Sequence, residues 1–454
     1  MDIKFIFRQA LPVVDGWINY QTYVKEIPGA AIGVFVEDEV ILDKAYGYAN
    51  LEKQVRLTGE HLFRIASHSK LFTATAIMRL YNEGRISLDD GVSKHLLWFK
   101  SEIEDNLQDI CIHHLLTHTS GIISDGDCHF TKRHSPDRED IKTQVKNGIS
   151  VFKTSETVKY SNFGYAVLGQ LIEAVTGRSY SEYIQETILD PLGMLNTFTD
   201  VNDENLHRHA TGYTINLPGQ ERKPIDHFPA RAMDAAAGFS STVGDLIKFY
   251  RAHIYGDASL LPDHVKREMQ RVQVSFSTGT RGLGFEIANY PGGEVVYYHS
   301  GGYPGFKSLS GLNQKDKVIL VVLINATDGP NYSWFNAITT LFSSLVNRWE
   351  AWKTPDGEEA PDFSRLTGYY VNEIGVAMIC QVGSKLVLVS PDADDPASTL
   401  QILRHVEGNR FITPSGHPFT ASGETIEFVD GSDGEKVLID HHGSEAKRLN
   451  FHLN

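Results

Sequence analysis

The chain has 454 residues, of which 41% are hydrophobic and 10% aromatic, enough for packed cores in two domains or in one large and one small domain. Its formal net charge of −15 argues against nucleic acid and anionic membrane surfaces as partners. Three cysteines without paired spacing argue against a disulfide framework. The sequence has neither a signal-type apolar segment nor a membrane-length apolar run, so we expect a cytoplasmic protein.

A hairpin is the first element that the sequence predicts. A largely apolar run at 30–36 is separated by three acidic residues from a second run at 40–42, which is typical of two strands joined by a turn. Apolar residues then recur with a helical period from Leu71 to Tyr81, and Gly84 is the expected end of that helix.

The middle of the chain favours helices. Apolar positions within 165–175 share one helix face, and Gly177 follows as a stop signal. Residues 124–159 are mostly polar and lack periodicity. A long irregular segment within a compact domain is more typical of a lid or a binding loop than of a random insertion.

Strand signals return after this helical part. Residues 294–299 and 308–312 are predicted strands on either side of a glycine-rich turn, and the continuous apolar run 318–324 predicts a strand covered on both faces. Apolar residues from Ile338 to Trp349 mark a helix. This order predicts an antiparallel sheet that is built from both ends of the region, flanked by helices and interrupted by an inserted helical part, an α/β (α+β) fold.

The C-terminal part differs from the rest of the chain in composition and in predicted secondary structure. Residues 353–364 are polar, contain two prolines and are predicted to be a linker. Short strand-like runs divided by glycine turns follow at 386–389, 426–429 and 437–439. We therefore expect a large domain at 1–352 and, at 365–454, a small antiparallel β domain, either a barrel or a sandwich.

The tetrad Ser67-His68-Ser69-Lys70 stands at the start of the first predicted helix. A serine hydroxyl is a poor nucleophile until a base takes its proton. Three residues are close to one helical turn, so the Lys70 ammonium is expected beside the Ser67 hydroxyl. If Ser67 opens the helix, the positive end of the helix dipole also favours a developing alkoxide.

Two further short motifs complete a candidate site. Tyr160 and Asn162 are two apart before the second helix, so both side chains can enter one cleft. Near a lysine, the pKa of the tyrosine is expected to fall, which makes Tyr160 a candidate general base. At the end of a predicted strand, His299 can meet a substrate, while Gly301 and Gly302 let its backbone approach. The backbone N–H groups of Gly302 and Ser67 are candidates for an oxyanion hole.

Three motifs in the order S-x-x-K, Y-x-N and H-x-G resemble the serine β-lactamase and penicillin-binding-protein superfamily, in its class C, D-alanyl carboxypeptidase and D-aminopeptidase branch (peptidase family S12). Tyrosine replaces the first serine of the S-D-N motif, and histidine replaces the lysine of K-T-G. The resemblance covers about residues 27 to 349. The sequence segments around the motifs are also similar to that superfamily, at 63–66, 84–90, 114–121 and 236–241.

The resemblance implies a β-lactamase/transpeptidase-like fold with Ser67 as the acylated nucleophile and Lys70 with Tyr160 as the proton-handling pair. Asn162 would orient the substrate carbonyl, and His299 would contact a carboxylate or the tyrosine. Histidine in place of lysine is more similar to peptidases, D-aminopeptidases and esterases than to β-lactamases. A small β domain behind such a fold resembles the lipocalin-like domain of some bacterial and archaeal peptidases.

The expected function is therefore a serine hydrolase that acts through an acyl-enzyme on small peptides, amides or esters. The alternative is an acyltransferase, such as the penicillin-binding-protein-type thioesterases that cyclise nonribosomal peptides with the same serine. A β-lactamase and an inactive binding relative are weaker alternatives. The sequence leaves the assembly open, including a homo-oligomer.

One histidine-rich segment raises the alternative of a metal site. His114 and His118 have i,i+4 spacing, and His113 is adjacent, which together suggest zinc. No third acidic or thiol ligand stands out beside them, and the resembling family uses this segment structurally. We therefore expect neither a metal nor a cofactor.

Overall fold

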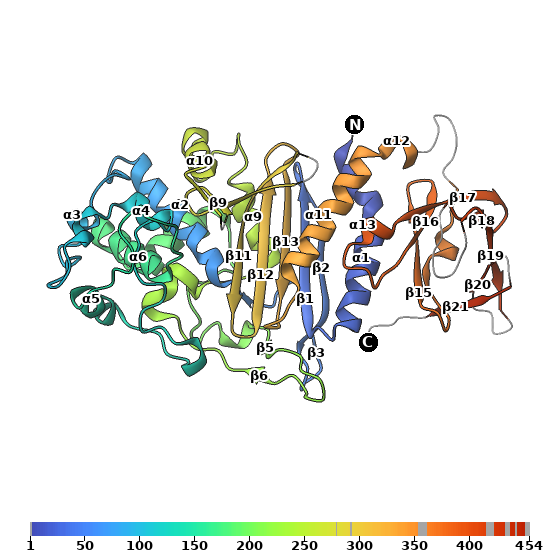
Figure 1. Ribbon diagram of the computed structural model, residues 1–454, viewed down its shortest axis with the longest axis horizontal. Coiled ribbons are helices and arrows are strands. Elements are labelled where there is room, and N and C mark those ends of the chain that lie inside the picture. Colours follow the sequence, from blue (N-terminus) through green and yellow to red (C-terminus); the bar gives the residue numbers. More distant parts are fainter. Residues whose placement is uncertain are drawn as a thin grey trace. The chain divides into compact units, whose positions relative to one another are not determined.

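The computed structural model describes residues 2–277, 279–290, 293–352, 361–414, 422–431, 436–440 and 443–449 (Figure 1). The chain forms two compact units. The larger unit is Pro28–Asn331, and the smaller unit combines Met1–Ile27 with Tyr332–Asn454.

The larger unit is built on an antiparallel nine-stranded sheet with the order β3-β2-β1-β13-β12-β11-β10-β9-β8. Its strands are β1 (Gly29–Val36), β2 (Glu39–Asn50), β3 (Val55–Arg56), β8 (Val274–Phe276), β9 (Gly279–Arg281), β10 (Glu286–Asn289), β11 (Val295–Tyr303), β12 (Phe306–Asn313) and β13 (Val318–Ile324). Ala30 pairs with Ile324 and Val36 with Val318, so the first and last strands of the unit are neighbours (Figure 1). A sheet built from both ends of the region is therefore confirmed.

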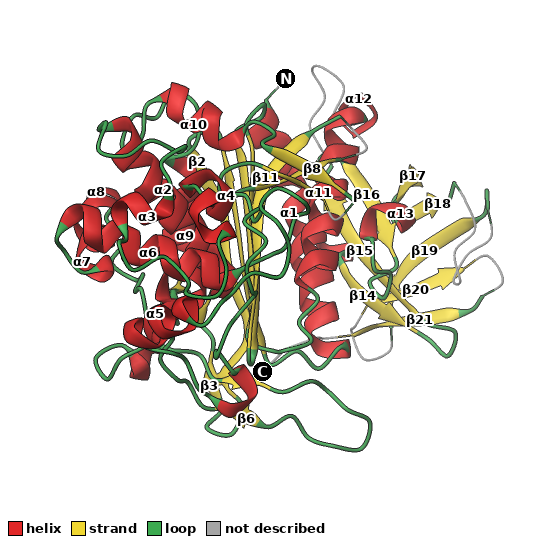
Figure 2. Cartoon of the chain, turned by 60° about the vertical axis from the view of Figure 1, so that its left-hand side comes forward, coloured by secondary structure: helices red, strands yellow, loops and turns green. Residues whose placement is uncertain are grey.

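Helices of the larger unit lie beside this sheet (Figure 2). They are α2 (Ser69–Asn82), α3 (Val92–His95), α4 (Ile112–Leu116), α5 (Arg138–Lys146), α6 (Asn162–Thr176), α7 (Tyr180–Ile184), α8 (Asp190–Leu192), α9 (Val243–Arg251) and α10 (Asp263–Gln270). Helix α9 packs on β1 and β13. A Cβ at Gly33 would lie 2.2 Å from Val243 Cγ1, so the missing side chain allows this close approach. Phe72 stacks on Phe239 and Phe249, with ring centroids 4.6 and 4.0 Å away.

Short elements join the helical part to the sheet region. Strand β4 (Phe63–Arg64) pairs with β7 (Ser240–Ser241), and β5 (Gly212–Tyr213) pairs with β6 (Pro224–Ile225). Because β4 directly precedes the Ser67 tetrad, its pairing with β7 ties the tetrad to the segment before α9.

Both predicted helices of the larger unit are present, as α2 and α6. Helix α6 begins at Asn162 because the Ser161 hydroxyl accepts a hydrogen bond from Gly164 N at 2.8 Å, and it ends at Gly177 with φ +72°. Gly84, with φ +69°, follows the end of α2. The irregular segment 124–159 contains α5 and otherwise consists mainly of loops.

The smaller unit contains a closed antiparallel barrel, which confirms the expected small β fold. Its strands are β14 (Gly368–Val371), β15 (Val376–Val382), β16 (Lys385–Val389), β17 (Gln401–Glu407), β18 (Arg410–Ile412), β19 (Thr425–Asp430), β20 (Lys436–Asp440) and β21 (Glu445–Leu449). Its core is aromatic and aliphatic and includes Tyr370, Phe411 and Phe428. Most of the predicted linker, 353–360, lies outside the described residues.

Four helices complete the smaller unit: α1 (Ile3–Val24), α11 (Asn331–Asn347), α12 (Trp349–Trp352) and α13 (Pro396–Thr399). Helix α1, which sequence reasoning missed, packs against β15. Trp17 Nε1 donates to Ala393 O at 2.8 Å, and Gln21 Nε2 donates to Pro391 O at 2.7 Å. Among the described helices, none combines the length and apolar character needed to cross a membrane.

Candidate active site

Ser67 lies in a 3-10 turn, Ala66–His68, immediately before α2. The helix therefore starts two residues later than the tetrad suggested, and Ser67 stands just ahead of its positive end. Ala66 has φ +51°, a left-handed conformation that is unfavourable for alanine. This sharp turn leaves Ser67 partly exposed although both of its neighbours are buried.

The Lys70 ammonium is buried and makes three hydrogen bonds. Its Nζ donates to Ser67 Oγ at 3.1 Å, to Asn162 Oδ1 at 2.6 Å and to Ala236 O at 2.8 Å. An ammonium has three N–H donors, so these acceptors satisfy all of them. The lysine is thereby fixed next to the serine, as the spacing of one helical turn predicts.

Burial lowers the pKa of Lys70 to about 7, because the charged form loses its hydration. The carboxylates of Asp125 and Glu286 oppose this change and raise the pKa, whereas the nearby Arg281 guanidinium lowers it further. Near neutral pH, a large fraction of Lys70 is therefore the free amine and can accept a proton.

Tyr160 donates a hydrogen bond from its hydroxyl to Ser67 Oγ at 2.8 Å. Burial raises the pKa of Tyr160, contrary to the expectation that the lysine would lower it. The prediction was wrong because the Lys70 ammonium lies 4.8 Å from the ring centroid and donates to other acceptors, while desolvation disfavours phenolate. Tyr160 is thus a neutral phenol and a proton donor.

Asn162 joins the Lys70 cluster to the irregular segment 124–159. Its Oδ1 accepts from Lys70, and its Nδ2 donates to Asp125 Oδ1 at 2.6 Å. Sequence reasoning predicted a binding loop in this segment but missed Asp125 itself. Only the approach of the loop to the start of α6 brings that carboxylate into the site.

His118 packs against the ring of Tyr160. Its ring lies 4.3 Å from the Tyr160 ring, and its Nδ1 accepts a hydrogen bond from Ser161 N at 3.1 Å. Burial holds the pKa of His118 well below its usual value, so the ring is neutral. His113 contacts Gln273, and His114 contacts Cys111. The described residues contain no group of three or more metal-ligating side chains.

His299 is buried in the middle of β11, and Gly301 and Gly302 continue the same strand instead of forming a turn. Its Nδ1 donates to Ser300 O at 2.7 Å, so Nε2 is the unprotonated nitrogen. Burial, and secondarily Lys70, lowers its pKa to about 3. The ring is neutral, and among the described residues it makes no hydrogen bond to Tyr160. A charged anchor for a carboxylate must therefore come from another residue.

The glycines after His299 allow β11 to approach the nucleophile turn. A Cβ at Gly301 would lie 2.1 Å from Ile65 O, whereas Gly302 is exposed. The neighbouring strand β10 pairs with β11 only as far as Glu286 opposite Tyr298. Beyond that pair, no described strand pairs with this edge of β11.

Arg281, at the end of β9, is the second residue that sequence reasoning missed. Its guanidinium carbon lies 5.7 Å from the centroid of the Tyr160 ring, and its Nη2 lies 3.6 Å from Glu286 Oε1. No motif marks this arginine in the sequence. The β9–β10 pairing, Arg281 opposite Glu286, carries both side chains to the site.

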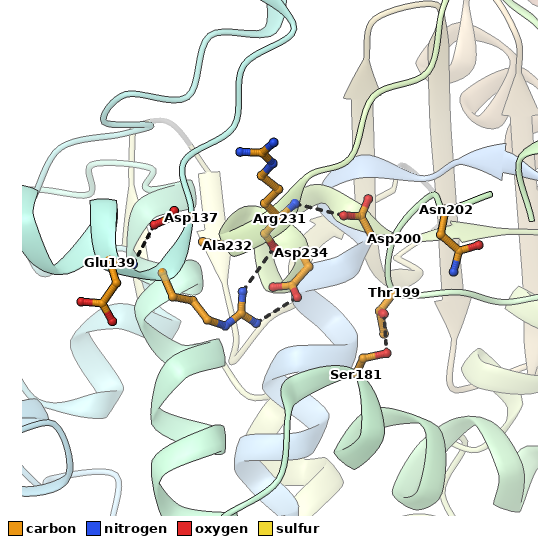
Figure 3. A pocket seen from close by; sticks show the side chains of 10 residues that line it. Asp137, Glu139, Ser181, Thr199, Asp200, Asn202, Arg231, Ala232 and Asp234 are labelled. Carbon is orange, nitrogen blue, oxygen red and sulfur yellow. Dashed lines mark hydrogen bonds and ion pairs between the residues drawn. The ribbon is translucent and has the colours of Figure 1, made fainter. Parts of the chain in front are cut away.

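A separate cavity of about 670 Å3 is lined by Arg231, Ala232 and Asp234, which precede Ala236 in the chain (Figure 3). Arg138 Nη2 lies 3.1 Å from Asp234 Oδ2 at its wall, and the Asp200 carboxylate accepts from Arg231 N at 3.0 Å. Burial raises the pKa of Asp234 to about 6. These contacts hold the segment that leads into the turn presenting Ala236 to Lys70.

A sheet-and-helix fold with an S-x-x-K serine is typical of β-lactamases and penicillin-binding proteins. The profile of the β-lactamase family matches residues 19–335, and the chain belongs to this family. Protein flp of Staphylococcus aureus (strain MRSA252) is 31% identical over 322 residues, 69% of this chain and 62% of the relative. The chain thus spans less than two thirds of that relative's length.

Two solved structures share the fold. The octameric penicillin-binding protein homologue from Pyrococcus abyssi has a TM-score of 0.64 at 24% identity, over 96% of this chain and 100% of the other. The D-amino acid amidase from Ochrobactrum anthropi SV3, complexed with D-phenylalanine, has a TM-score of 0.62 at 22% identity, over 75% of this chain and 99% of the other.

Proposed function

We propose that the protein is a serine hydrolase that cleaves small peptides, amides or esters through an acyl-enzyme on Ser67. One observation carries this proposal: the Ser67 hydroxyl lies within hydrogen-bond distance of both Lys70 Nζ, at 3.1 Å, and Tyr160 OH, at 2.8 Å. A nucleophile between a base and an acid has both proton-transfer partners that acyl transfer requires.

The two partners take different roles in this mechanism. The free amine of Lys70 accepts the Ser67 proton as Oγ attacks the substrate carbonyl. The phenol of Tyr160 gives its proton to the leaving group as the scissile bond breaks. The Lys70 ammonium then returns a proton to Tyr160, and a water molecule releases the acyl group by the reverse sequence. The low pKa of Lys70 and the high pKa of Tyr160 support this division.

The negative oxygen of the tetrahedral intermediate needs hydrogen-bond donors. We propose the backbone N–H groups of Ser67 and Gly302 for this role. Asn162 holds Lys70 through its Oδ1, so we assign it to positioning of the lysine as well as to the substrate side of the cleft. Gly301 contributes by letting β11 lie against Ile65.

Covalent labelling tests the proposal directly. A fluorophosphonate probe is expected to add its mass to a peptide that contains Ser67, and Ser67→Ala is expected to abolish both labelling and hydrolysis of p-nitrophenyl esters. Ser69→Ala is a matched control, because Ser69 is buried and its hydroxyl donates to Ala66 O. Undiminished labelling of the Ser67→Ala variant would overturn the assignment.

A preference for D-amino acid substrates is a finer proposal, supported by the likeness to the D-amino acid amidase. Paired D- and L-amino acid p-nitroanilides test it, with faster turnover of the D-isomer expected. Equal rates for the two isomers would remove this part of the proposal.

We also propose a homo-oligomer, supported by the fold shared with the octameric homologue. Light scattering coupled to size-exclusion chromatography tests it, and a mass equal to one chain of 50.7 kDa would contradict it.

A further inference from the structure

One residue, His118, contacts three consecutive residues around the proposed proton donor. Lys159 N donates to His118 O at 2.8 Å, and Ser161 N donates to His118 Nδ1 at 3.1 Å. Between these two bonds, the Tyr160 ring lies 4.3 Å from the His118 ring, with an angle of 31° between the ring planes. The tyrosine is therefore held at its ring and at both of its backbone neighbours.

His118 makes these contacts in an unusual backbone conformation. It follows the end of α4 and has φ +61°, in the left-handed region. This region is unfavourable for a residue with a Cβ, and such residues occur where surrounding contacts hold them, often at functional sites. Here the conformation places the carbonyl oxygen and the ring nitrogen of one buried residue against the same segment, 159–161.

The His118 ring can accept the hydrogen bond from Ser161 only while it is neutral. A ring nitrogen that accepts a hydrogen bond carries no proton, so Nδ1 is the free nitrogen and Nε2 carries the proton. Burial holds the pKa of His118 well below its usual value, and Lys70, Arg281 and His299 lower it further. The acceptor for Ser161 N therefore stays available near neutral pH, and no further cation is placed beside Lys70.

His118 is itself held by its surroundings. Its ring lies 5.2 Å from the Tyr165 ring, and Tyr165 OH donates to Leu116 O at 2.9 Å, two residues before His118. The hydrogen bond from Tyr160 OH to Ser67 Oγ changes as protons move, so it cannot by itself keep the phenol in place. The contacts with His118 take no part in the chemistry and remain throughout.

We propose that His118 is a positioning residue that acts through Tyr160 and holds the phenol in place for proton transfer to the leaving group. This inference rests on the proposed Ser67 function. In the step concerned, the scissile bond breaks, its electron pair stays on the leaving atom, and that atom takes the Tyr160 proton. The phenolate then takes a proton from the Lys70 ammonium. Because Lys70 acts in the earlier attack by Ser67, loss of His118 is expected to impair protonation of the leaving group specifically.

Two esters that differ only in the leaving group test the proposal. The p-nitrophenyl ester of N-acetyl-D-alanine releases a stable anion that needs little protonation, whereas the ethyl ester releases an alkoxide that needs a proton. His118→Ala removes both the ring and the acceptor. It is expected to lower kcat/KM about 100-fold for the ethyl ester, the effect of a misplaced reacting group, and no more than about threefold for the p-nitrophenyl ester.

His118→Asn is the conservative variant. Its amide oxygen can accept from Ser161 N, and asparagine tolerates the left-handed backbone, but the ring is lost. The ratio of kcat/KM for the ethyl ester to that for the p-nitrophenyl ester is therefore expected to fall only about 10-fold. This variant also carries the test if His118→Ala does not fold.

Two comparisons separate positioning from a general structural role. In a Tyr160→Phe background, His118→Asn is expected to lower the ratio no further, because the group that it positions is absent. His113→Asn is the matched control, since His113 lies in the same segment and contacts Gln273, and the ratio is expected to stay unchanged. An equal loss for both esters, an unchanged ratio in the His118 variants, or losses that add in the Tyr160→Phe background would overturn the proposal. The proposed Ser67 function fails separately, through absence of fluorophosphonate labelling in the wild type.

Discussion

At the residue scale, the chemistry of the site depends on a lysine whose charge is set by its surroundings. Lys70 is buried, and its pKa is lowered to about 7. Nearby charges act on it in opposite directions, because Asp125 raises the pKa and Arg281 lowers it. The protein therefore holds the amine close to its midpoint near neutral pH, where a general base is most effective.

Because Asp125 and Arg281 act on the pKa of Lys70 in opposite directions, we expect the pH profile of kcat/KM to shift in opposite directions when each is replaced. The wild-type kcat/KM for a neutral ester is expected to rise with pH through about 7, because only the free amine of Lys70 accepts the serine proton. Asp125→Asn removes a charge that raises the pKa, so the rising limb moves to lower pH. Arg281→Gln removes a charge that lowers it, so the limb moves to higher pH. Each shift is expected to be on the order of one pH unit. Shifts in the same direction would show that another group controls the limb.

At the element scale, the turn Asp234–Gly238 connects the site to the cavity in Figure 3. The Ala236 carbonyl accepts from Lys70, and the Ala235 carbonyl accepts from Thr73 Oγ1 at 2.6 Å. Arg138 holds the first residue of the turn through Asp234. Three separate contacts thus fix this short π-helical turn, whose Ala235 and Ala236 carbonyls accept hydrogen bonds from side chains of α2.

Breaking the ion pair at this turn is expected to affect stability first. Arg138→Met leaves the Asp234 carboxylate without its guanidinium partner, and we expect a loss of about 1–3 kcal/mol in the free energy of unfolding. Asp234→Asn in the Arg138→Met background is expected to recover part of the loss, because the unpaired charge is removed. Urea denaturation of the wild type, the two single variants and the double variant measures the coupling free energy between the two side chains. Strictly additive losses would show that the two side chains stabilise the turn independently.

At the scale of the whole molecule, the smaller unit combines segments from both ends of the chain. Helix α1 packs on the barrel strand β15, and Tyr369 OH donates to Gly16 O at 2.5 Å. A Cβ at Gly16 would lie 2.5 Å from Met378 Sδ, so the glycine permits close packing there. The sequence predicts an independent C-terminal domain at 365–454, and this boundary is a proposal that truncation tests.

A chain that ends at Trp352 is expected to have a lower melting temperature and to aggregate more readily. The physical reason is that Trp17 and Gln21, both buried in the full chain, lose the acceptors Ala393 and Pro391. Tyr369→Phe in the full-length protein is a mild control and is expected to cost only about 1 kcal/mol through the loss of the hydroxyl that donates to Gly16 O. A truncated chain that stays monodisperse with an unchanged melting temperature would contradict this dependence.

The sequence by itself determined the features that local spacing controls. Ser67 and Lys70 are one helical turn apart, Gly177 ends α6, and the run 318–324 is apolar throughout, so each is read from a few neighbouring residues. The order of strands and helices also predicted the sheet and the barrel. Local patterns carry this information because helix and strand periods repeat within a few residues.

Only the tertiary structure decided which distant groups meet at the serine and how burial changes their acidity. Asp125 comes from an irregular loop and Arg281 from the β9–β10 pairing, and no period or motif marks either one. The pKa of Tyr160 rises although a lysine is near, because desolvation depends on the atoms packed around a group and not on its neighbours in sequence. Long-range packing therefore set the charge state of the candidate site, whereas local sequence set the positions of Ser67 and Lys70.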